Sequence, residues 1–392
     1  MRKPLRVLFA IGSLAGGGSE RQLITILQHL DRSRFEPTLY LLSRSGEFLK
    51  EVPENVRVIS FDDDPVVSRL YVPGSIYRRQ VAHLTGTLRD SDFDLLYDRT
   101  ILMACVAGPA ARQADVRRVA TVVANPDRDM RATFRRFGWL KRHILATGYR
   151  NAACVVANSE ALRRAVVERF NLSDNRTTMI PNGFNVAAIQ QQAEANPLVT
   201  LESHLVHIAA MGRFGAEKGF PNLLHAVRYL VLEKQRRNLV LWLLGAGPEE
   251  SLYRQLIAEA PSISDHVRMP GFVTNPFAIL SRVRLFCMSS HYEGSPNALV
   301  EAMACGVPVI STDCPFGPRE ILGDGRYGEL TPVSDWHSMA NAIERVLDNE
   351  SAAVERAHLA IESIQNRFDA LRTTARLEEL FEAIVGENGP SH

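Results

Sequence analysis

Short apolar runs alternate with segments of helical periodicity along nearly the whole chain. The apolar runs are too short for buried helices and are rich in Val, Leu and Ile, which favours strands buried on both faces. The first half contains Leu5–Ile11, Thr38–Leu42, Val56–Ser60, Asp94–Tyr97, Val119–Val123, Ala152–Ala157 and Met179–Ile180. The second half contains Leu205–Met211, Leu239–Leu244, Leu285–Met288 and Val307–Ser311. Strands that alternate with helices predict an α/β chain with doubly wound parallel sheets.

Size and composition exclude several other classes of protein. The chain has 392 residues, enough for two or three domains. Its 45 basic and 44 acidic residues nearly cancel, so no nucleic-acid partner is implied. The five cysteines lack metal-ligand spacing, which predicts buried thiols in a reducing compartment. No apolar stretch has the length of a membrane span and the N-terminal run leads straight into a glycine loop, so we expect a cytoplasmic protein.

The most informative stretch is residues 285–322, where a buried strand is followed by a tight turn and a short helix. Ser295 is the predicted N-cap of this helix, and Pro296 is predicted at its first position, where a missing N–H does no harm. The backbone amides at a helix N-terminus bind anions well. The amides concerned here belong to Asn297, Ala298 and Leu299.

Two carboxylates bracket that helix start. Glu293 precedes the helix, and Glu301 lies about one turn inside it, in the otherwise apolar segment NALVEAMAC. The neighbours of Glu301 at three and four residues are small or short, so its carboxylate needs a donor from elsewhere, and sugar hydroxyls are suitable donors. On shape alone, an ordinary strand–helix–strand unit with a surface glutamate remains the alternative.

The whole segment EGSPNALVEAMACGVPVIST, with seven residues between Glu293 and Glu301, resembles the E-x7-E signature of the retaining glycosyltransferases of family 4. Those enzymes have the GT-B fold, in which two Rossmann-like domains face a cleft that holds a nucleotide-sugar. The resemblance implies that Glu301 holds the ribose of the nucleotide and that Glu293 holds hydroxyls of the donor sugar. The paired carboxylates of glycosidases are therefore not the right analogy, because the family places Glu301 on the ribose.

Two further elements of the second half resemble the same family. Residues 212–219, GRFGAEKG, match its G-R-x-x-x-x-K-G element after a strand. The forked guanidinium of Arg213 and the flexible ammonium of Lys218 suit the diphosphate, although a charged surface loop is the alternative. Residues 271–276 resemble the loop whose backbone contacts the nucleobase, which implies donor-binding roles for Phe272 and Val273. The implied catalytic residues are Arg213, Lys218 and Glu293.

The glycine-rich loop at residues 12–18 follows the first strand, and Ser19 with Gln22 predicts a capping box for the next helix. The loop is neither a Walker A motif nor a G-x-G-x-x-G dinucleotide motif, which counts against a NAD-dependent oxidoreductase. It resembles the family's N-terminal glycine loop, which places Gly17 and Gly18 among the donor-binding residues. Many relatives carry a histidine near the position of Asn125, and this chain has none there.

The resemblance also implies the domain organisation. Residues 1–184 form an N-terminal acceptor-binding domain, and residues 185–365 form a C-terminal nucleotide-sugar-binding domain. Residues 366–392 form a helix that crosses back to the first domain. No metal and no other cofactor is expected, because Arg213 and Lys218 supply positive charge. The segment CPFGPREIL resembles transferases that build bacterial surface polysaccharides, often from UDP-sugars.

Residues 128–150 hold seven Lys and Arg against one Asp, with aromatic residues interleaved. A solvated basic helix face, a surface for anionic lipid head groups and a surface for an acidic acceptor remain alternatives. Because the rest of the chain is neutral, a nucleic-acid surface is disfavoured. If the segment binds anionic lipid head groups, the protein is expected to lie peripherally on the inner face of the cell membrane.

We therefore expect a metal-independent hexosyltransferase. It is expected to move a hexose or N-acetylhexosamine from a nucleotide-diphosphate sugar, with a UDP-sugar favoured, to a glycan acceptor. Whether that acceptor is lipid-linked is left open. Two alternatives remain. One is a non-catalytic partner that binds nucleotide-sugar, and the other is a different GT-B enzyme such as a nucleotide-sugar epimerase or a phosphorylase.

Overall fold

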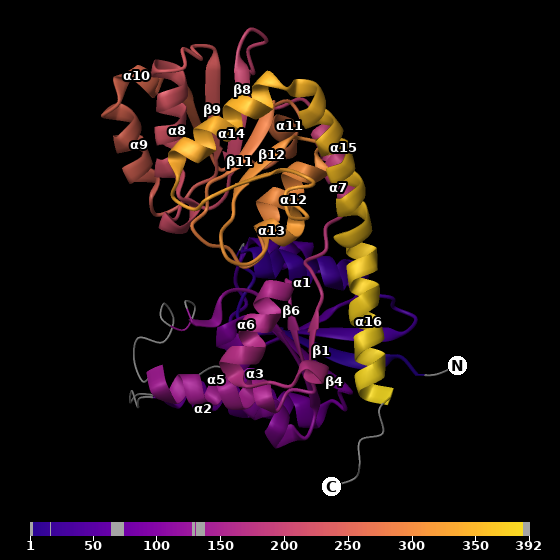
Figure 1. The fold of residues 1–392 in the computed structure, drawn as a ribbon. Coiled ribbons are helices and arrows are strands. Elements are labelled where there is room, and N and C mark those ends of the chain that lie inside the picture. Colours follow the sequence, from indigo (N-terminus) through magenta and orange to yellow (C-terminus); the bar gives the residue numbers. More distant parts are fainter. Residues whose placement is uncertain (1–2, 16, 64–73, 128–129, 131–137, 387–392) are drawn as a thin grey trace. The chain divides into compact units, whose positions relative to one another are not determined.

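The computed structural model describes residues 3–15, 17–63, 74–127, 130 and 138–386, and the chain forms two compact units (Figure 1). Unit 1 comprises Met1–Gly183 and Ala370–His392, and unit 2 comprises Phe184–Asp369. The chain therefore passes between the units twice, after residue 183 and after residue 369. The sequence places these boundaries after residues 184 and 365.

Unit 1 is built on a seven-stranded sheet in the order β3-β2-β1-β4-β5-β6-β7, and every pairing is parallel. Its strands are β1 (Leu5–Ile11), β2 (Phe35–Leu41), β3 (Arg57–Ser60), β4 (Leu95–Arg99), β5 (Arg117–Val122), β6 (Cys154–Ala157) and β7 (Thr177–Met179). Its helices are α1 (Gly18–His29), α2 (Ser75–Asp90), α3 (Ile101–Ala114), α5 (Gly138–Arg150), α6 (Glu160–Phe170) and α16 (Ala370–Gly386). Short 3-10 turns are η1 (Glu47–Glu51), η2 (Phe61–Asp63) and η3 (Asp174–Arg176).

Unit 2 is built on a six-stranded parallel sheet in the order β10-β9-β8-β11-β12-β13. Its strands are β8 (Val206–Met211), β9 (Leu239–Leu244), β10 (Val267–Gly271), β11 (Leu285–Met288), β12 (Val309–Thr312) and β13 (Glu329–Thr331). Its longer helices are α7 (Val186–Ala193), α8 (Phe220–Leu232), α9 (Glu250–Ala258), α12 (Asn297–Ala304), α14 (Trp336–Asp348) and α15 (Glu350–Arg367). Its short turns are η4 (Ala216–Lys218), α10 (Pro261–Ser264), α11 (Phe277–Leu280) and α13 (Pro318–Ile321).

Both sheets have the doubly wound order in which the first strand of the unit lies in the middle and later strands extend to either side. The predicted parallel α/β architecture is therefore confirmed. Helix α3 is among the helices that the sequence analysis did not predict. Residues 103–108, Ala110 and Ala111 of α3 are buried, so the middle of this helix shows no amphipathic period. Gly108 and Pro109 are also poor helix formers.

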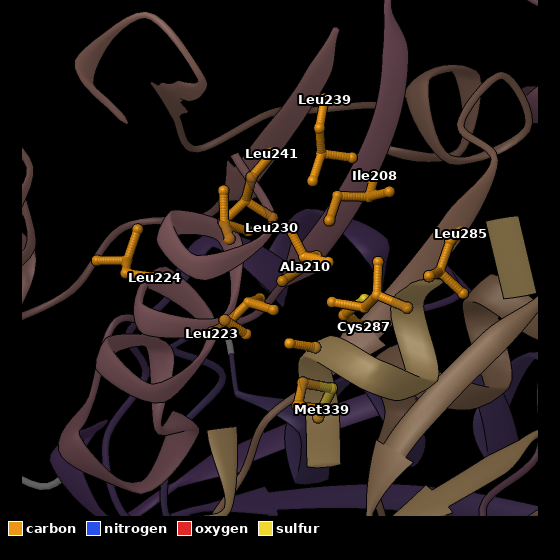
Figure 2. Packing of buried hydrophobic residues seen from close by; sticks show 14 of the residues in the cluster. Ile208, Ala210, Leu223, Leu224, Leu230, Leu239, Leu241, Leu285, Cys287 and Met339 are labelled. Carbon is orange, nitrogen blue, oxygen red and sulfur yellow. The ribbon is translucent and has the colours of Figure 1, made fainter. Parts of the chain in front are cut away.

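The core of unit 2 shows how the sheet fixes the loop that leads into α8. The buried apolar residues of α8 recur three or four positions apart, which gives one continuous stripe. Figure 2 shows Leu223 and Leu230 of this stripe beside Ile208 of β8 and Leu241 of β9. Because α8 begins directly after Gly219, this packing also fixes the loop between β8 and α8.

Helix α16, at the end of the chain, packs on the sheet of unit 1. Phe381 is fully buried and meets the rings of Phe9, Phe35 and Tyr97 edge-on, with centroids 5.6–6.2 Å apart. Glu378 accepts hydrogen bonds from the Asp31 amide at 2.7 Å and from Arg34 at 3.0 Å. These contacts make the last helix part of the first unit's core.

We predict that Phe381→Ala lowers the free energy of unfolding by about 3–5 kcal/mol, because it leaves a cavity among three aromatic rings. Leu371→Ala, on the same helix at a position 63% exposed, should change it by less than about 0.5 kcal/mol. Urea denaturation followed by circular dichroism compares the two variants. Equal losses would contradict the role assigned to Phe381.

Candidate active site

The switch point of the unit 2 sheet lies between β8 and β11, where the strand order reverses. The loops after these two strands leave from the same, carboxyl-terminal edge of the sheet. Arg213 and Lys218 follow β8, and Glu293 follows β11. Open α/β sheets bind ligands at this place, so the three residues that the family resemblance implied as catalytic lie where a ligand is expected.

The loop after β8 is held rigidly by its apolar residue. Phe214 is fully buried and packs against Phe220 and Tyr253. The Tyr253 hydroxyl donates a hydrogen bond to the Gly215 carbonyl at 2.9 Å. Arg213 is exposed, and within the described part of the chain its guanidinium makes no hydrogen bond or ion pair. The loop is thus fixed by packing, and the Arg213 guanidinium that it carries is exposed to solvent.

Gly219 lets this loop lie against the loop after β11. Its φ of +60° is left-handed, and a Cβ there would lie 2.3 Å from the carbonyl oxygen of Ser289. Any side chain would collide with this backbone atom, so glycine is required for both its conformation and its size. Ser289 in turn donates its hydroxyl to the Lys218 carbonyl at 2.8 Å, and the His291 amide donates to the Glu217 carbonyl at 2.8 Å.

Lys218 and Glu293 form an ion pair across the two loops, with Nζ 2.6 Å from Oε1. Their side chains are only 17% and 11% exposed, so the pair is poorly screened by solvent. The Ser290 hydroxyl donates to the same Oε1 atom at 2.7 Å. The sequence analysis missed Ser290; its only signal was a polar pair directly after an apolar strand.

Helix α12 begins one residue later than the sequence predicts. Pro296 is the N-cap, with ψ of 88°, and Asn297 is the first helical residue; Ser295 makes no cap hydrogen bond. The Leu299 amide donates to the Pro296 carbonyl at 3.1 Å, so it is engaged within the first turn. Of the three amides predicted to bind an anion, that of Leu299 is therefore used within the helix. The physical reason is that Pro296 has a non-helical ψ and acts as the acceptor instead.

Glu301 lies in α12 at a half-buried position. Its charge acts on the thiol of Cys305 one turn later, where burial first and Glu301 second raise the pKa to about 12. The helix ends at Ala304, and Gly306 follows with φ of +76°, as expected for a residue after a helix C-terminus.

The loop after β10 presents an aromatic side chain. Gly271 has φ of +85°, and Phe272 beside it is 71% exposed, whereas Val273 packs against the core of unit 2. A large apolar side chain with this exposure is available for stacking. Phe272 and Val273 thus leave the same edge of the sheet as the catalytic candidates.

The loop after β12 closes on the start of α12. Gly317 has φ of +110°, and a Cβ there would lie 2.5 Å from the Pro296 ring. Cys314 in this loop is buried, and its pKa is raised to about 12 by burial and, secondarily, by the charge of Glu293. Thr312 at the end of β12 donates its hydroxyl to the Ser290 carbonyl at 2.5 Å. The sequence analysis did not anticipate the positions of Cys314 and Thr312 beside Glu293 and Ser290.

The remaining donor-binding candidates lie in unit 1. Gly17 is the N-cap of α1 and Gly18 is its first residue, so the predicted capping box of Ser19 and Gln22 is wrong. Gln22 is buried, and its side-chain amide is satisfied there by two hydrogen bonds with the backbone of Gly183, at 2.8 and 3.0 Å. The helix start at the switch point of this sheet is therefore tied to the residue where the chain leaves the unit.

Metal and disulfide chemistry have no visible site in the described ranges. No group of three or more His, Cys, Asp or Glu is arranged to hold a metal ion there. The five cysteines are unpaired, four buried and Cys305 half-buried, as the sequence predicts for thiols in apolar runs.

Comparison with known proteins gives the family. Residues 16–188 match the profile described as Glycosyltransferase Family 4, and residues 201–367 match that of Glycosyl transferases group 1. This chain is a glycosyltransferase. The two profiles together span both units, and the predicted resemblance to the family 4 transferases is confirmed.

Several similar proteins have names that describe glycan assembly. A Campylobacter jejuni N-acetylgalactosaminyltransferase that acts on a diphospho-undecaprenol-linked sugar is 24% identical over 87% of this chain and 89% of its own. The Rhizobium meliloti lipopolysaccharide core biosynthesis glycosyltransferase LpsE is 29% identical over 56% of this chain and 61% of its own. The structure of Anabaena HepE with UDP and glucose has a TM-score of 0.77 at 21% identity, covering 97% of this chain and 100% of that one. This likeness confirms the GT-B fold of the glycosyltransferase.

Proposed function

We propose that this glycosyltransferase moves a hexose or N-acetylhexosamine from a UDP-sugar to a glycan acceptor during assembly of a bacterial surface polysaccharide, with retention of anomeric configuration. The observation that carries the proposal is the Lys218–Glu293 ion pair at the switch point of unit 2. Arg213 lies in the same loop as Lys218, and its guanidinium makes no hydrogen bond or ion pair with a described residue. The UDP in HepE supports the nucleotide, and the names of the relatives support the acceptor class. A lipid-linked acceptor is favoured by the undecaprenol in the name of the Campylobacter relative.

The chemistry of the proposal depends on charge at the leaving group. When the bond to the sugar breaks, negative charge grows on the departing diphosphate, and fixed donors aimed at that charge lower the barrier. Arg213 and Lys218 supply two cations, and the amides of Asn297 and Ala298 lie at the start of α12 close in sequence to Glu293. A retaining reaction of this kind needs no protein nucleophile if the leaving phosphate assists attack on the same face.

The remaining residues would bind the donor. Glu301 would hold the ribose hydroxyls, and Glu293 would hold hydroxyls of the sugar near the reacting carbon. Phe272 and Val273 would contact the base. Gly17 and Gly18 of unit 1 would allow close approach of the donor to their backbone, which is the property that glycine gives such a loop.

We predict that donor hydrolysis or transfer is unchanged in EDTA, because side-chain cations take the place of a metal at the diphosphate. Among the described residues no group of three or more His, Cys, Asp or Glu could hold a metal ion, and Asp63 is paired with Arg44. The assay uses UDP-hexoses and UDP-N-acetylhexosamines, chosen first by thermal shift, since a bound ligand stabilises the native state. Activity that disappears in EDTA and returns with Mn²⁺ would overturn the metal-free mechanism; sugar interconversion without an acceptor would favour an epimerase.

A second prediction separates the two glutamates. Glu301→Ala should weaken UDP binding about tenfold or more, because it removes hydrogen bonds to a charged acceptor. Glu293→Ala should weaken UDP binding by less than about twofold while it lowers turnover, because its proposed contacts with the donor are to the sugar alone and its ion-pair partner Lys218 stays available to the diphosphate. Calorimetry with UDP measures both. Glu344→Ala, in α14 and paired with Lys234, is the control, and equal losses in the first two variants would show that the roles are wrongly assigned.

We further propose that the protein works in the cytoplasm at the inner face of the membrane. No helix among the described residues is long and apolar enough to cross a bilayer. Of the basic segment 128–150, residues 128–129 and 131–137 lie outside the described residues, so the role of their basic side chains at a lipid surface stays a prediction. The described part shows Trp139 at 73% and Leu140 at 40% exposed at the start of α5, with Arg142 exposed beside them.

The test is flotation with phosphatidylglycerol vesicles at low and high salt. Binding should fall with salt, because each basic residue contributes at most about 1 kcal/mol through a screened field. Trp139→Glu should weaken binding, whereas Leu371→Glu, also at an exposed apolar position, should not. Both variants should bind UDP normally. Absence of vesicle binding at every ionic strength would favour a soluble acceptor.

A further inference from the structure

The two oxygens of the Glu293 carboxylate have different surroundings. Oε1 accepts hydrogen bonds from Lys218 at 2.6 Å and from Ser290 at 2.7 Å. Oε2 accepts none within the part of the chain that the structure describes. A carboxylate has room for about four hydrogen bonds, so Oε2 is the atom left for a ligand.

Ser290 is itself fixed from the neighbouring strand. It is fully buried, and its carbonyl accepts the Thr312 hydroxyl at 2.5 Å. Thr312 ends β12 and is only 3% exposed. The chain of contacts therefore runs from β12 through Ser290 to one oxygen of Glu293, and each donor and acceptor in it is buried or nearly so.

Lys218 cannot hold Glu293 alone during the proposed reaction. Its ammonium is a point charge on a flexible stem, and the diphosphate competes for it. When Lys218 turns toward that anion, the Ser290 hydroxyl is the donor that stays on Oε1. Without it, the carboxylate plane would be free to rotate about its last bond, a torsion with broad, weak preferences.

We propose that Ser290, held by Thr312, is a positioning residue that fixes the plane of the Glu293 carboxylate so that Oε2 accepts a hydroxyl of the donor sugar. This deepens the proposed function and rests on the role given there to Glu293. Ser290 then affects the contribution of the sugar to the binding free energy of the donor and leaves the contribution of the nucleotide unchanged.

The first experiment compares UDP with UDP-glucose by calorimetry. Ser290→Ala should lower the affinity for UDP-glucose about tenfold, the loss expected for a hydrogen bond to a charged group, and leave that for UDP within about twofold. Thr312→Val should act in the same direction with a smaller effect, and Thr312→Ser, which keeps the hydroxyl, should restore the wild-type values. Equal losses for both ligands, or none for either, would overturn the proposal.

Ser311→Ala is the matched control. Ser311 is as fully buried as Ser290 and lies on β12 next to Thr312, but its hydroxyl donates to the Thr312 carbonyl at 2.8 Å and not to Glu293. If Ser311→Ala discriminates between UDP and UDP-glucose as Ser290→Ala does, the effect is a general loosening of the sheet edge, and the positioning role is wrong.

The second experiment needs no ligand. Ser290→Ala should lower Tm by roughly 2–4 °C in the wild-type background and by clearly less in the Glu293→Met background, where its acceptor is gone. The same shift in both backgrounds would show that the two residues are not coupled. If the wild type binds neither UDP nor UDP-glucose, the proposed donor is wrong, and this cycle still decides whether Ser290 holds Glu293.

Discussion

The ion pair between Lys218 and Glu293 is the contact on which the site of unit 2 depends. It joins the loops after β8 and β11, the two strands at which the order of the sheet reverses. A partly buried pair of this kind contributes little to stability unless further hydrogen bonds satisfy its remaining atoms. Ser290 supplies one such bond, to the Glu293 carboxylate, and Ser289 holds the backbone of Lys218 through the Lys218 carbonyl. The pair is thus embedded in a network whose geometry is set before any ligand arrives, which is the condition for effective electrostatic catalysis.

The backbone around this pair is as specific as its side chains. Gly219 and Gly317 each bring a loop into a contact that no side chain would allow, the first against Ser289 and the second against Pro296. Behind them, the buried ring of Phe214 and the apolar stripe of α8 anchor the first loop to the sheet. Rigid packing on one side of the loop therefore supports polar chemistry on the other, as functional sites on well-packed scaffolds require.

Much of this arrangement could be predicted from the sequence. Buried parallel strands read as short apolar runs, and β9 and β11 begin and end where those runs do. Arg213, Lys218, Glu293 and Glu301 were singled out as candidates because a specific motif surrounds them, and the first three lie at the switch point of the unit 2 sheet. Helix starts were less reliable, since Ser295 and Ser19 have typical capping side chains but the folded backbone uses Pro296 and Gly17. The roles of Ser290 and Thr312 could not be predicted, because they arise from the lateral pairing of β11 with β12, and one strand carries no information about its neighbour.

The surroundings of Cys314 have a consequence for the oxidation chemistry of the site. Only the thiolate reacts readily with peroxides and alkylating agents, and the raised pKa keeps this thiol protonated at neutral pH. Burial removes access as well. A cysteine thus packs beside the ion pair as a small apolar side chain without making the site sensitive to the redox state of its surroundings. Burial and the raised pKa together therefore disfavour oxidation or alkylation of Cys314 while unit 2 stays folded.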